Sequence, residues 1–249
     1  MNSNTLRLLL FLVCNCLYGA QGSLLYWSGS TKGTVSLHGS GRVDSSSSTS
    51  MEWSLVHPLG DLPYPVEFYG SSRFAMHSKL SVEQAVQIET INLAANSTTP
   101  FSMNWEYLGL AIPFYKKNQS SILRPRSISF GMEWHFLEYS LNEGSLPSLL
   151  HVDRSISAFT LQPEWQGNWK GSSWEWFLKP RGVRMQDLGG TPAAHMEGEV
   201  GFRRGRLSLG FKRKKTRIFP SDRAAQGGVT PSDLIFIRDG WYAQVQRSF

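Results

Sequence analysis

The chain ends in Trp241-Tyr-Ala-Gln-Val-Gln-Arg-Ser-Phe249, a stretch in which apolar and polar residues alternate. Trp241, Ala243 and Val245 fall on one face of an extended chain together with the final Phe249, and the two amides fall on the other face. A period of two residues indicates a strand with one face in an apolar medium and the other in a polar one. Terminal residues of most domains fray unless they are tied down. An aromatic residue at the very end therefore predicts that this terminus is part of a sheet.

This terminal strand resembles that of bacterial outer-membrane β-barrels, whose last strand commonly ends on Phe with apolar residues at every second position before it. Trp241, Val245 and Phe249 match the pattern, whereas Arg247 stands where the class usually has an apolar or aromatic residue. The resemblance implies that the three matching residues form the assembly signal that the barrel-insertion machinery reads. It also implies a location in the outer membrane of a Gram-negative bacterium.

The first 22 residues have the pattern of a secretory signal peptide. A basic residue precedes the apolar run 8–13, and the small residues Ala20 and Gly22 follow it. The run is shorter than the roughly 20 residues that span a bilayer. We therefore expect cleavage after Gly22 and a β-barrel domain over residues 23–249. A retained N-terminal anchor is the alternative.

Both cysteines, Cys14 and Cys16, lie in the expected signal segment. The rest of the chain therefore has no disulfide framework and no cysteine-based metal site. Its histidines do not fall at the close spacing of a metal-binding motif, so we expect neither a metal nor another cofactor. No later segment has the apolar length of a transmembrane helix, which leaves a closed β-barrel as the way to span a membrane.

Several internal stretches show the same alternation as the terminal strand. The clearest are 101–107 and 128–136, in which aromatic residues and Met alternate with smaller or polar residues. We interpret their apolar faces, including Trp105 and Met132, as facing lipid. The runs between turns predict an all-β, antiparallel transmembrane barrel of about 12 strands. A secreted β-sandwich adhesin or carbohydrate-binding module would show the same alternation and is the chief alternative.

The polar faces predict a lumen that is filled with charged residues. The expected inward set is Glu52, Arg73, Lys79, Glu106, Glu133, His135 and Glu199. A barrel of about 12 strands is intermediate between small filled barrels and wide porins. We therefore expect a structural, surface-binding or narrow-channel protein in place of an open general porin. The tight turn at 203–206 and the long connection at 220–232 fit short periplasmic turns and longer outer loops.

A basic run near the C-terminus contains Lys212, Arg213, Lys214, Lys215 and Arg217. Export argues against nucleic acid as its partner. On a barrel the run falls near the outer rim, where these side chains can bind the phosphates of lipopolysaccharide through charge-assisted hydrogen bonds. We predict contact with lipopolysaccharide and outer-membrane lipids, and a solvated charged hairpin is the alternative.

Ser129, Glu133 and His135 share the polar face of one expected strand and are the candidate catalytic residues. A serine and a histidine near a carboxylate can support acyl transfer with the histidine as general base, so a barrel lipid hydrolase or deacylase is a further alternative. No compact serine–histidine motif accompanies them, and polar lumen residues are expected in any barrel. We therefore favour a hydrogen-bonded network inside the lumen.

Overall fold

The computed structural model describes residues 21–35, 41–58, 64–72, 74–88, 91–117, 124–142, 149–169, 171–187, 192–218 and 233–248. Residues 1–20 of the expected signal peptide, Arg73 and the terminal Phe249 lie outside these ranges. Among the described residues, no helix has the length and apolar character needed to cross a membrane.

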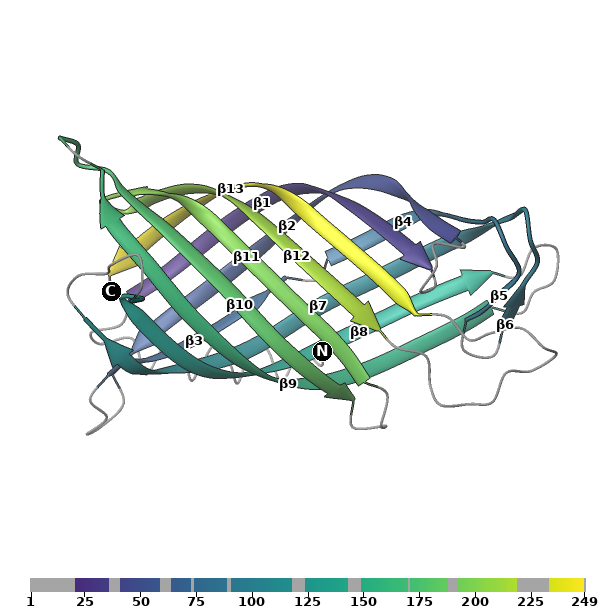
Figure 1. Ribbon diagram of the computed structural model, residues 1–249, viewed down its shortest axis with the longest axis horizontal. Coiled ribbons are helices and arrows are strands. Elements are labelled where there is room, and N and C mark those ends of the chain that lie inside the picture. The colour runs from purple at the N-terminus through teal and green to yellow at the C-terminus, as the bar shows by residue number, and fades with distance from the viewer. Residues whose placement is uncertain are drawn as a thin grey trace.

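The described residues form strands that close into a barrel (Figure 1). All strand pairs are antiparallel, and the first strand of the wall pairs with both the second and the last, which leaves a single closed sheet. The alternative of a β-sandwich, which consists of two sheets, is therefore wrong. The strands are β1 (Gln21–Val35), β2 (Gly41–His57), β3 (Val66–Ser71), β4 (Phe74–Val82), β5 (Val86–Ile88), β6 (Ile91–Leu93), β7 (Ser97–Lys116), β8 (Ser127–Asn142), β9 (Leu149–Asn168), β10 (Glu175–Asp187), β11 (Pro192–Arg204), β12 (Leu207–Ile218) and β13 (Leu234–Ser248).

The barrel wall has fewer strand positions than the sequence predicted. The main sheet contains 11 strands, but β3 and β4 both pair with β2 on one side and with β7 on the other. β3 and β4 therefore lie end to end between β2 and β7 and occupy one position, so the wall has ten positions. Ten lies below the predicted number of about 12 in part because β3 and β4 share one position. β5 and β6 pair only with each other.

The two ends of the barrel differ in their connections. Gln21 and Ser248 pair with each other at one end, which we call the terminal end and which lies at the left in Figure 1. The tight turn between β11 and β12 lies at the same end, where Gly205 has a φ of 57° that glycine adopts without steric cost. The opposite end, which we call the head, contains β4 and the β5–β6 hairpin. Short turns are typical of the periplasmic side of outer-membrane barrels, and the β11–β12 turn fits that pattern, whereas the other connections at the terminal end, 58–65, 117–126 and 169–174, are longer.

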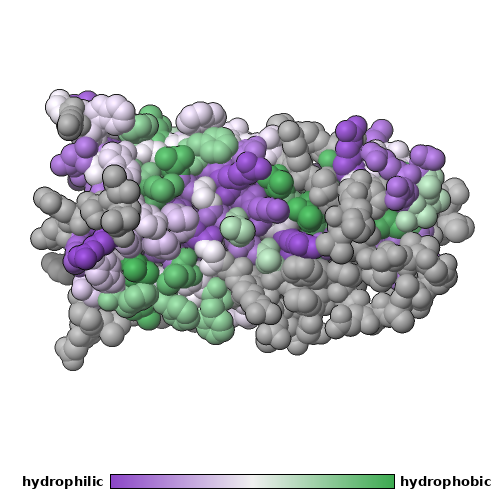
Figure 2. All heavy atoms as spheres, in the orientation of Figure 1, coloured by the Kyte–Doolittle hydropathy of each residue, from purple (hydrophilic) through white to green (hydrophobic). Residues whose placement is uncertain are grey.

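The outer face of the wall is apolar near the terminal end. Figure 2 shows hydrophobic residues gathered over this half of the visible face, and a group of hydrophilic residues at the upper edge of the head. This apolar belt is formed by residues of nearly every strand position. Its exposed members include Leu24, Tyr26, Met51, Phe68, Ile112, Phe130, Trp134, Phe159, Leu161, Leu178, Val200, Phe202, Leu207, Leu209, Trp241 and Val245.

In the head the polarity is reversed, and the apolar side chains point into the barrel. They form one cluster, which we call the head core and to which the β5–β6 hairpin contributes. Its members are Val43, Met76, Leu80, Val82, Val86, Ile88, Leu93, Phe101, Met103, Leu137, Tyr139, Leu141, Ile218, Leu234 and Phe236. A strand whose outer face meets water stabilises itself by burying the other face. The head is therefore built like a water-soluble domain on top of a membrane-spanning section.

The reversal corrects the expected orientation of the 101–107 stretch. Phe101, Met103 and Tyr107 are buried inside the barrel, and Trp105 packs against the head core. The lipid-facing prediction for this stretch was wrong because it lies in the head part of β7, where the apolar face points inward. The 128–136 stretch lies at belt level, and there the prediction is confirmed, since Phe130 is exposed.

The expected inward set is confirmed in part. Glu52, Glu133 and His135 are buried in the lumen, and Glu199 accepts a hydrogen bond from the buried Tyr242. The prediction was wrong for two members, because in the head the apolar face of a strand points inward and its polar face outward. Lys79 is exposed next to the buried Leu80, and Glu106 precedes the buried Tyr107, so both charged residues lie on the outer face.

Candidate functional site

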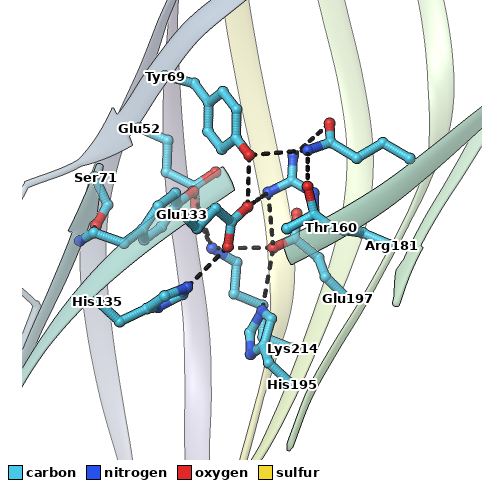
Figure 3. A network of polar contacts seen from close by, with 12 residues as sticks. Glu52, Tyr69, Ser71, Glu133, His135, Thr160, Arg181, His195, Glu197 and Lys214 are labelled. Atoms are coloured by element: carbon cyan, nitrogen blue, oxygen red, sulfur yellow. Dashed lines mark hydrogen bonds and ion pairs between the residues drawn. The ribbon is translucent and has the colours of Figure 1, made fainter. Parts of the chain in front are cut away.

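A network of buried ion pairs crosses the lumen (Figure 3). Lys212 and Lys214 are two residues apart on β12 and therefore point to the same side. The Nζ of Lys214 lies 2.7 Å from Oε1 of Glu52 and 3.2 Å from Oε2 of Glu197. The Nζ of Lys212 lies 2.8 Å from Oε1 of Glu197 and also pairs with Glu52. Two lysines thus connect β12 with a carboxylate of β2 and one of β11.

A second set of contacts is centred on Glu133 of β8. Its Oε1 accepts hydrogen bonds from Nη1 of Arg181 on β10 and from the hydroxyl of Tyr69 on β3, both at 2.7 Å. The same hydroxyl accepts a hydrogen bond of 2.9 Å from Nε2 of Gln162. Nη1 of Arg181 also lies 4.0 Å from Oε2 of Glu197. Arg181 therefore joins the two sets into one network.

At the centre of this ion-pair network three carboxylates face three cations, and Glu199 lies further out, 4.0 Å from Nζ of Lys212. The three central carboxylates are no more than 7 % exposed, so an isolated charge at any of these positions would be costly. Opposite charges and hydrogen bonds offset the cost of removing buried charges from water when the geometry is good. The three carboxylates and three cations of the network are Glu52, Glu133, Glu197, Arg181, Lys212 and Lys214.

His135 is held within the network by both of its ring nitrogens. Its Nδ1 accepts a hydrogen bond of 3.0 Å from Nε1 of Trp105, and its Nε2 lies 2.8 Å from Oε2 of Glu133. Because Nδ1 acts as an acceptor, the ring proton is on Nε2 and is donated to Glu133. Neither nitrogen is left to take a proton from a serine, as a general base in acyl transfer would.

The candidate catalytic residues are therefore only partly brought together. Glu133 and His135 are in contact, whereas Ser129 lines a cavity that His135 does not line. The arrangement supports the alternative of a hydrogen-bonded lumen network. Among the residues that the structure describes, no group of three His, Cys, Asp or Glu side chains is arranged to hold a metal ion.

Part of this network has a signal in the sequence that the expected inward set does not include. Glu197 pairs in register with Lys214, and Glu199 pairs with Lys212, on the neighbouring strands β11 and β12. Directly opposite residues of antiparallel strands share a face, and opposite charges there attract. A Glu-x-Glu pattern one tight turn before a Lys-x-Lys pattern predicts such pairs. Arg181 of β10 likewise lies directly opposite Glu197 on the neighbouring strand β11. The contact of Tyr69 with Glu133 depends on barrel closure, and no local pattern marks it.

Two cavities flank the ion-pair network. The cavity on the terminal side has a volume of about 130 Å³ and a polar lining that includes Ser129, Gln162 and Lys179. The cavity on the head side is about 30 Å³ and is lined in part by Met103 and Phe236 of the head core. The smaller cavity has room for about two water molecules. Within the described residues, the network therefore lies between the two cavities, and the head core borders the smaller one.

The structure divides the basic run between the two faces of β12. Lys212 and Lys214 are buried in the lumen, whereas Arg213 and Lys215 are exposed on the outside. Arg217 also faces outward and forms an ion pair with Asp233. The expectation of one surface cluster is corrected to two sets, because neighbouring residues of a strand point to opposite faces.

The terminal strand lies as its alternation predicts. Trp241 is 72 % exposed and Val245 is 57 % exposed on the outer face, while Tyr242 between them is buried in the lumen. Phe211 of β12 packs edge-on against Trp241, with ring centroids 5.5 Å apart. The third residue of the expected assembly signal, Phe249, lies outside the described residues.

Comparison with solved structures finds folds similar to this one at low sequence identity. They include Neisserial surface protein A (10% identity, 93% of this chain and 100% of that chain covered, TM-score 0.34). The translocator domain of the autotransporter NalP from Neisseria meningitidis is also similar (11% identity, 98% and 95% covered, TM-score 0.42). So is the P. putida toluene transporter TodX (9% identity, 95% and 92% covered, TM-score 0.30). No protein-family model matches the chain, and no curated protein sequence matches it.

At these identities the likeness concerns the fold alone. The class follows from the molecule itself, because a closed antiparallel barrel with an apolar belt outside and a charged lumen is a transmembrane β-barrel. The chain is thus a β-barrel of the outer-membrane class, which is the class and the location that its terminal strand predicted.

Proposed function

We propose that this protein is an outer-membrane barrel with a closed lumen, which acts as a structural or surface-binding protein and does not conduct solutes as an open porin. One observation carries the proposal. The ion-pair network and the head core place buried side chains inside the lumen at two successive levels. Conduction through the described lumen would require both to open.

Opening the first level would be costly. A path past Lys214 would separate its ammonium from Glu52 and Glu197, which lie 2.7 and 3.2 Å away. Leaving one partner of a buried ion pair without the other costs about 3–5 kcal/mol. The narrow-channel alternative would need this change together with displacement of the head core.

Electrical recording in a planar lipid bilayer tests the proposal. We expect no stepwise conductance from protein whose heat-modifiable migration on a gel shows an intact barrel. A porin of known conductance, reconstituted in the same bilayers, confirms that steps are detectable. Reproducible steps from the intact barrel would contradict the closed lumen and favour the narrow channel.

The proposal includes export and assembly. Removal of residues 1–22 would leave β1 from residue 23 onward, since this strand begins at Gln21. The outward-facing Trp241 and Val245 support a terminal strand that the barrel-insertion machinery recognises, with Phe249 as its last residue.

Contact with lipopolysaccharide is proposed for the outward-facing part of the basic run only. Arg213 and Lys215 follow Phe211 on the outer face of β12, at the edge of the apolar belt that is nearer to the head. Such a position suits phosphates at the membrane surface. Lipopolysaccharide should raise the unfolding temperature of the parent more than that of the R213Q/K215Q variant. Equal stabilisation of both proteins would refute this contact.

A further inference from the structure

The larger of the two cavities beside the ion-pair network lies between the network and the terminal end of the barrel, and we call it the terminal cavity. Glu52 and Arg181 of the network border its inner end (Figure 3). It extends to Ser127, the first residue of β8, at the terminal end. The side chains of Lys179 and Glu164, which also line it, are 38 % and 25 % exposed. The cavity is therefore in contact with water.

The size of the terminal cavity is that of a small solute. Its volume of about 130 Å³ has room for about nine to thirteen water molecules. A hexose with its hydroxyl groups has about as many non-hydrogen atoms. A ligand of the size of a monosaccharide therefore fits inside, whereas a whole lipid or an oligosaccharide is too large to be enclosed.

Charges of both signs alternate around one half of the cavity wall. Its charged side chains come from four neighbouring strands of the sheet, and they are Glu164 of β9, Lys179 of β10, Glu199 of β11 and Lys212 of β12. Nζ of Lys179 lies 3.8 Å from Oε1 of Glu164, and Nζ of Lys212 lies 4.0 Å from Oε2 of Glu199. A ligand with a net charge would lie beside a group of its own sign at this wall, which is unfavourable. The alternation therefore favours a neutral ligand.

The other half of the wall presents mainly hydroxyl and amide groups. Ser23 and Ser54 lie 2.7 Å apart between their hydroxyl oxygens, and Nε2 of Gln244 donates to Ser23 at 2.8 Å. Among the described residues, Ser129 forms no hydrogen bond with another side chain, and Glu67 of β3 forms no ion pair. A hydroxyl group both donates and accepts, whereas a carboxylate only accepts. This part of the wall therefore has hydrogen-bonding capacity left for a ligand.

We infer that the terminal cavity is a binding site for a neutral, polyhydroxylated small molecule of the class of a monosaccharide. Each hydroxyl group of such a ligand can donate to a carboxylate or accept from an ammonium group, so it finds partners along the whole alternating wall. Ligand sites are typically concave, with a few convergent polar groups. The inference rests on the proposed function in one respect, that the network closes the lumen at the inner end of the cavity.

Equilibrium dialysis with three sugars of the same ring and different charge tests the inference. The full chain, folded in detergent micelles, is dialysed against radiolabelled glucose, glucosamine or glucuronate at mildly acidic pH, at which glucosamine is a cation and glucuronate an anion. We expect the Kd for glucose to be at least about tenfold lower than the Kd for either charged sugar, because each charged sugar meets a like charge in the alternating wall.

Variants of one strand separate the cavity from the rest of the barrel. S129A removes a hydroxyl group of the cavity wall and should raise the Kd for glucose about fivefold, the factor that one hydrogen bond supplies. S129F fills the cavity and should abolish binding. S140A is the matched control, since Ser140 lies on the outer face of β8 in the head, where its hydroxyl oxygen is 2.5 Å from that of Ser102. It should leave the Kd unchanged.

Three outcomes would overturn the inference: no binding of glucose by an intact barrel, tighter binding of either charged sugar than of glucose, or equal effects of S129A and S140A. Heat-modifiable migration is measured on every sample, so loss of folding is not counted as loss of binding. Swelling of protein-containing vesicles in glucose tests the proposed function separately. Swelling would refute the closed lumen, whereas an intact barrel that neither swells vesicles nor binds glucose would refute the site alone.

Discussion

Replacing Glu52 with Gln removes one of the three negative charges of the ion-pair network and keeps the shape of the side chain. The carboxylate of Glu52 lies 2.7 Å from Nζ of Lys214 and also pairs with Lys212. In the variant, both ammonium groups would depend on Glu197 as their remaining carboxylate at close range. Removing one partner of a buried ion pair costs about 3–5 kcal/mol. We expect a loss of this size in the free energy of unfolding.

Reversible denaturant unfolding in phosphatidylcholine vesicles, followed by tryptophan fluorescence, measures this loss. E52Q, K214M and the double variant complete a thermodynamic cycle. Contacting residues couple by about 0.5–3 kcal/mol, so the double variant should be more stable than the sum of the two single losses implies. E106Q removes a carboxylate on the outer face and should cost less than about 1 kcal/mol.

Two results would refute this account of the network. One is an E52Q variant that loses no more stability than E106Q. The other is an additive cycle, which would show that Glu52 and Lys214 contribute independently although their charged atoms are in contact.

Three further predictions concern the wall of the barrel. Leu110→Arg places a charge on the lipid-facing side of β7 and should reduce insertion into vesicles, at a cost of about 2–4 kcal/mol near the bilayer midplane. Gel migration measures the folded fraction. An equal effect of an Arg placed on the polar outer face of the head would contradict the assignment of the apolar belt to the membrane. Gly109→Ala would place a Cβ 2.5 Å from a ring carbon of Tyr69 and should lower the free energy of unfolding by about 1–3 kcal/mol. Gly198→Ala, whose Cβ would meet nothing within 4 Å, is its control, and equal losses would refute the packing argument. Deletion of Phe249 should lower the amount of protein in the outer membrane and leave degraded material in the periplasm, and unchanged membrane levels would contradict its role in assembly.

Strand periodicity was readable from the sequence because it is a local property. Side chains at every second position share a face of any extended chain, so the apolar face of the terminal strand and that of 128–136 were assigned correctly. The polar faces of the same strands predicted a charged lumen, and this prediction was correct for Glu133 and His135. The class of barrel likewise followed from the terminal strand.

The number of strand positions could not be read in this way. β3 and β4 are separate runs in the sequence, and they share a position only because both pair with β2 and β7. The ion-pair network is also a product of closure. Glu52 and Lys212 are 160 residues apart, and they meet because β2 and β12 face each other across the lumen.

The sequence by itself determined that the strands of this chain have one apolar and one polar face, since alternation depends only on the geometry of an extended backbone. It did not determine which face points inward, because lipid and a protein core are both apolar surroundings. Tertiary structure decided this at each level. At the belt, Phe130 faces outward and Glu133 inward, whereas in the head Phe101 and Leu141 point inward. The physical reason is that apolar side chains leave water for whichever apolar medium is available at their height along the barrel, and that height is known only once the wall is closed.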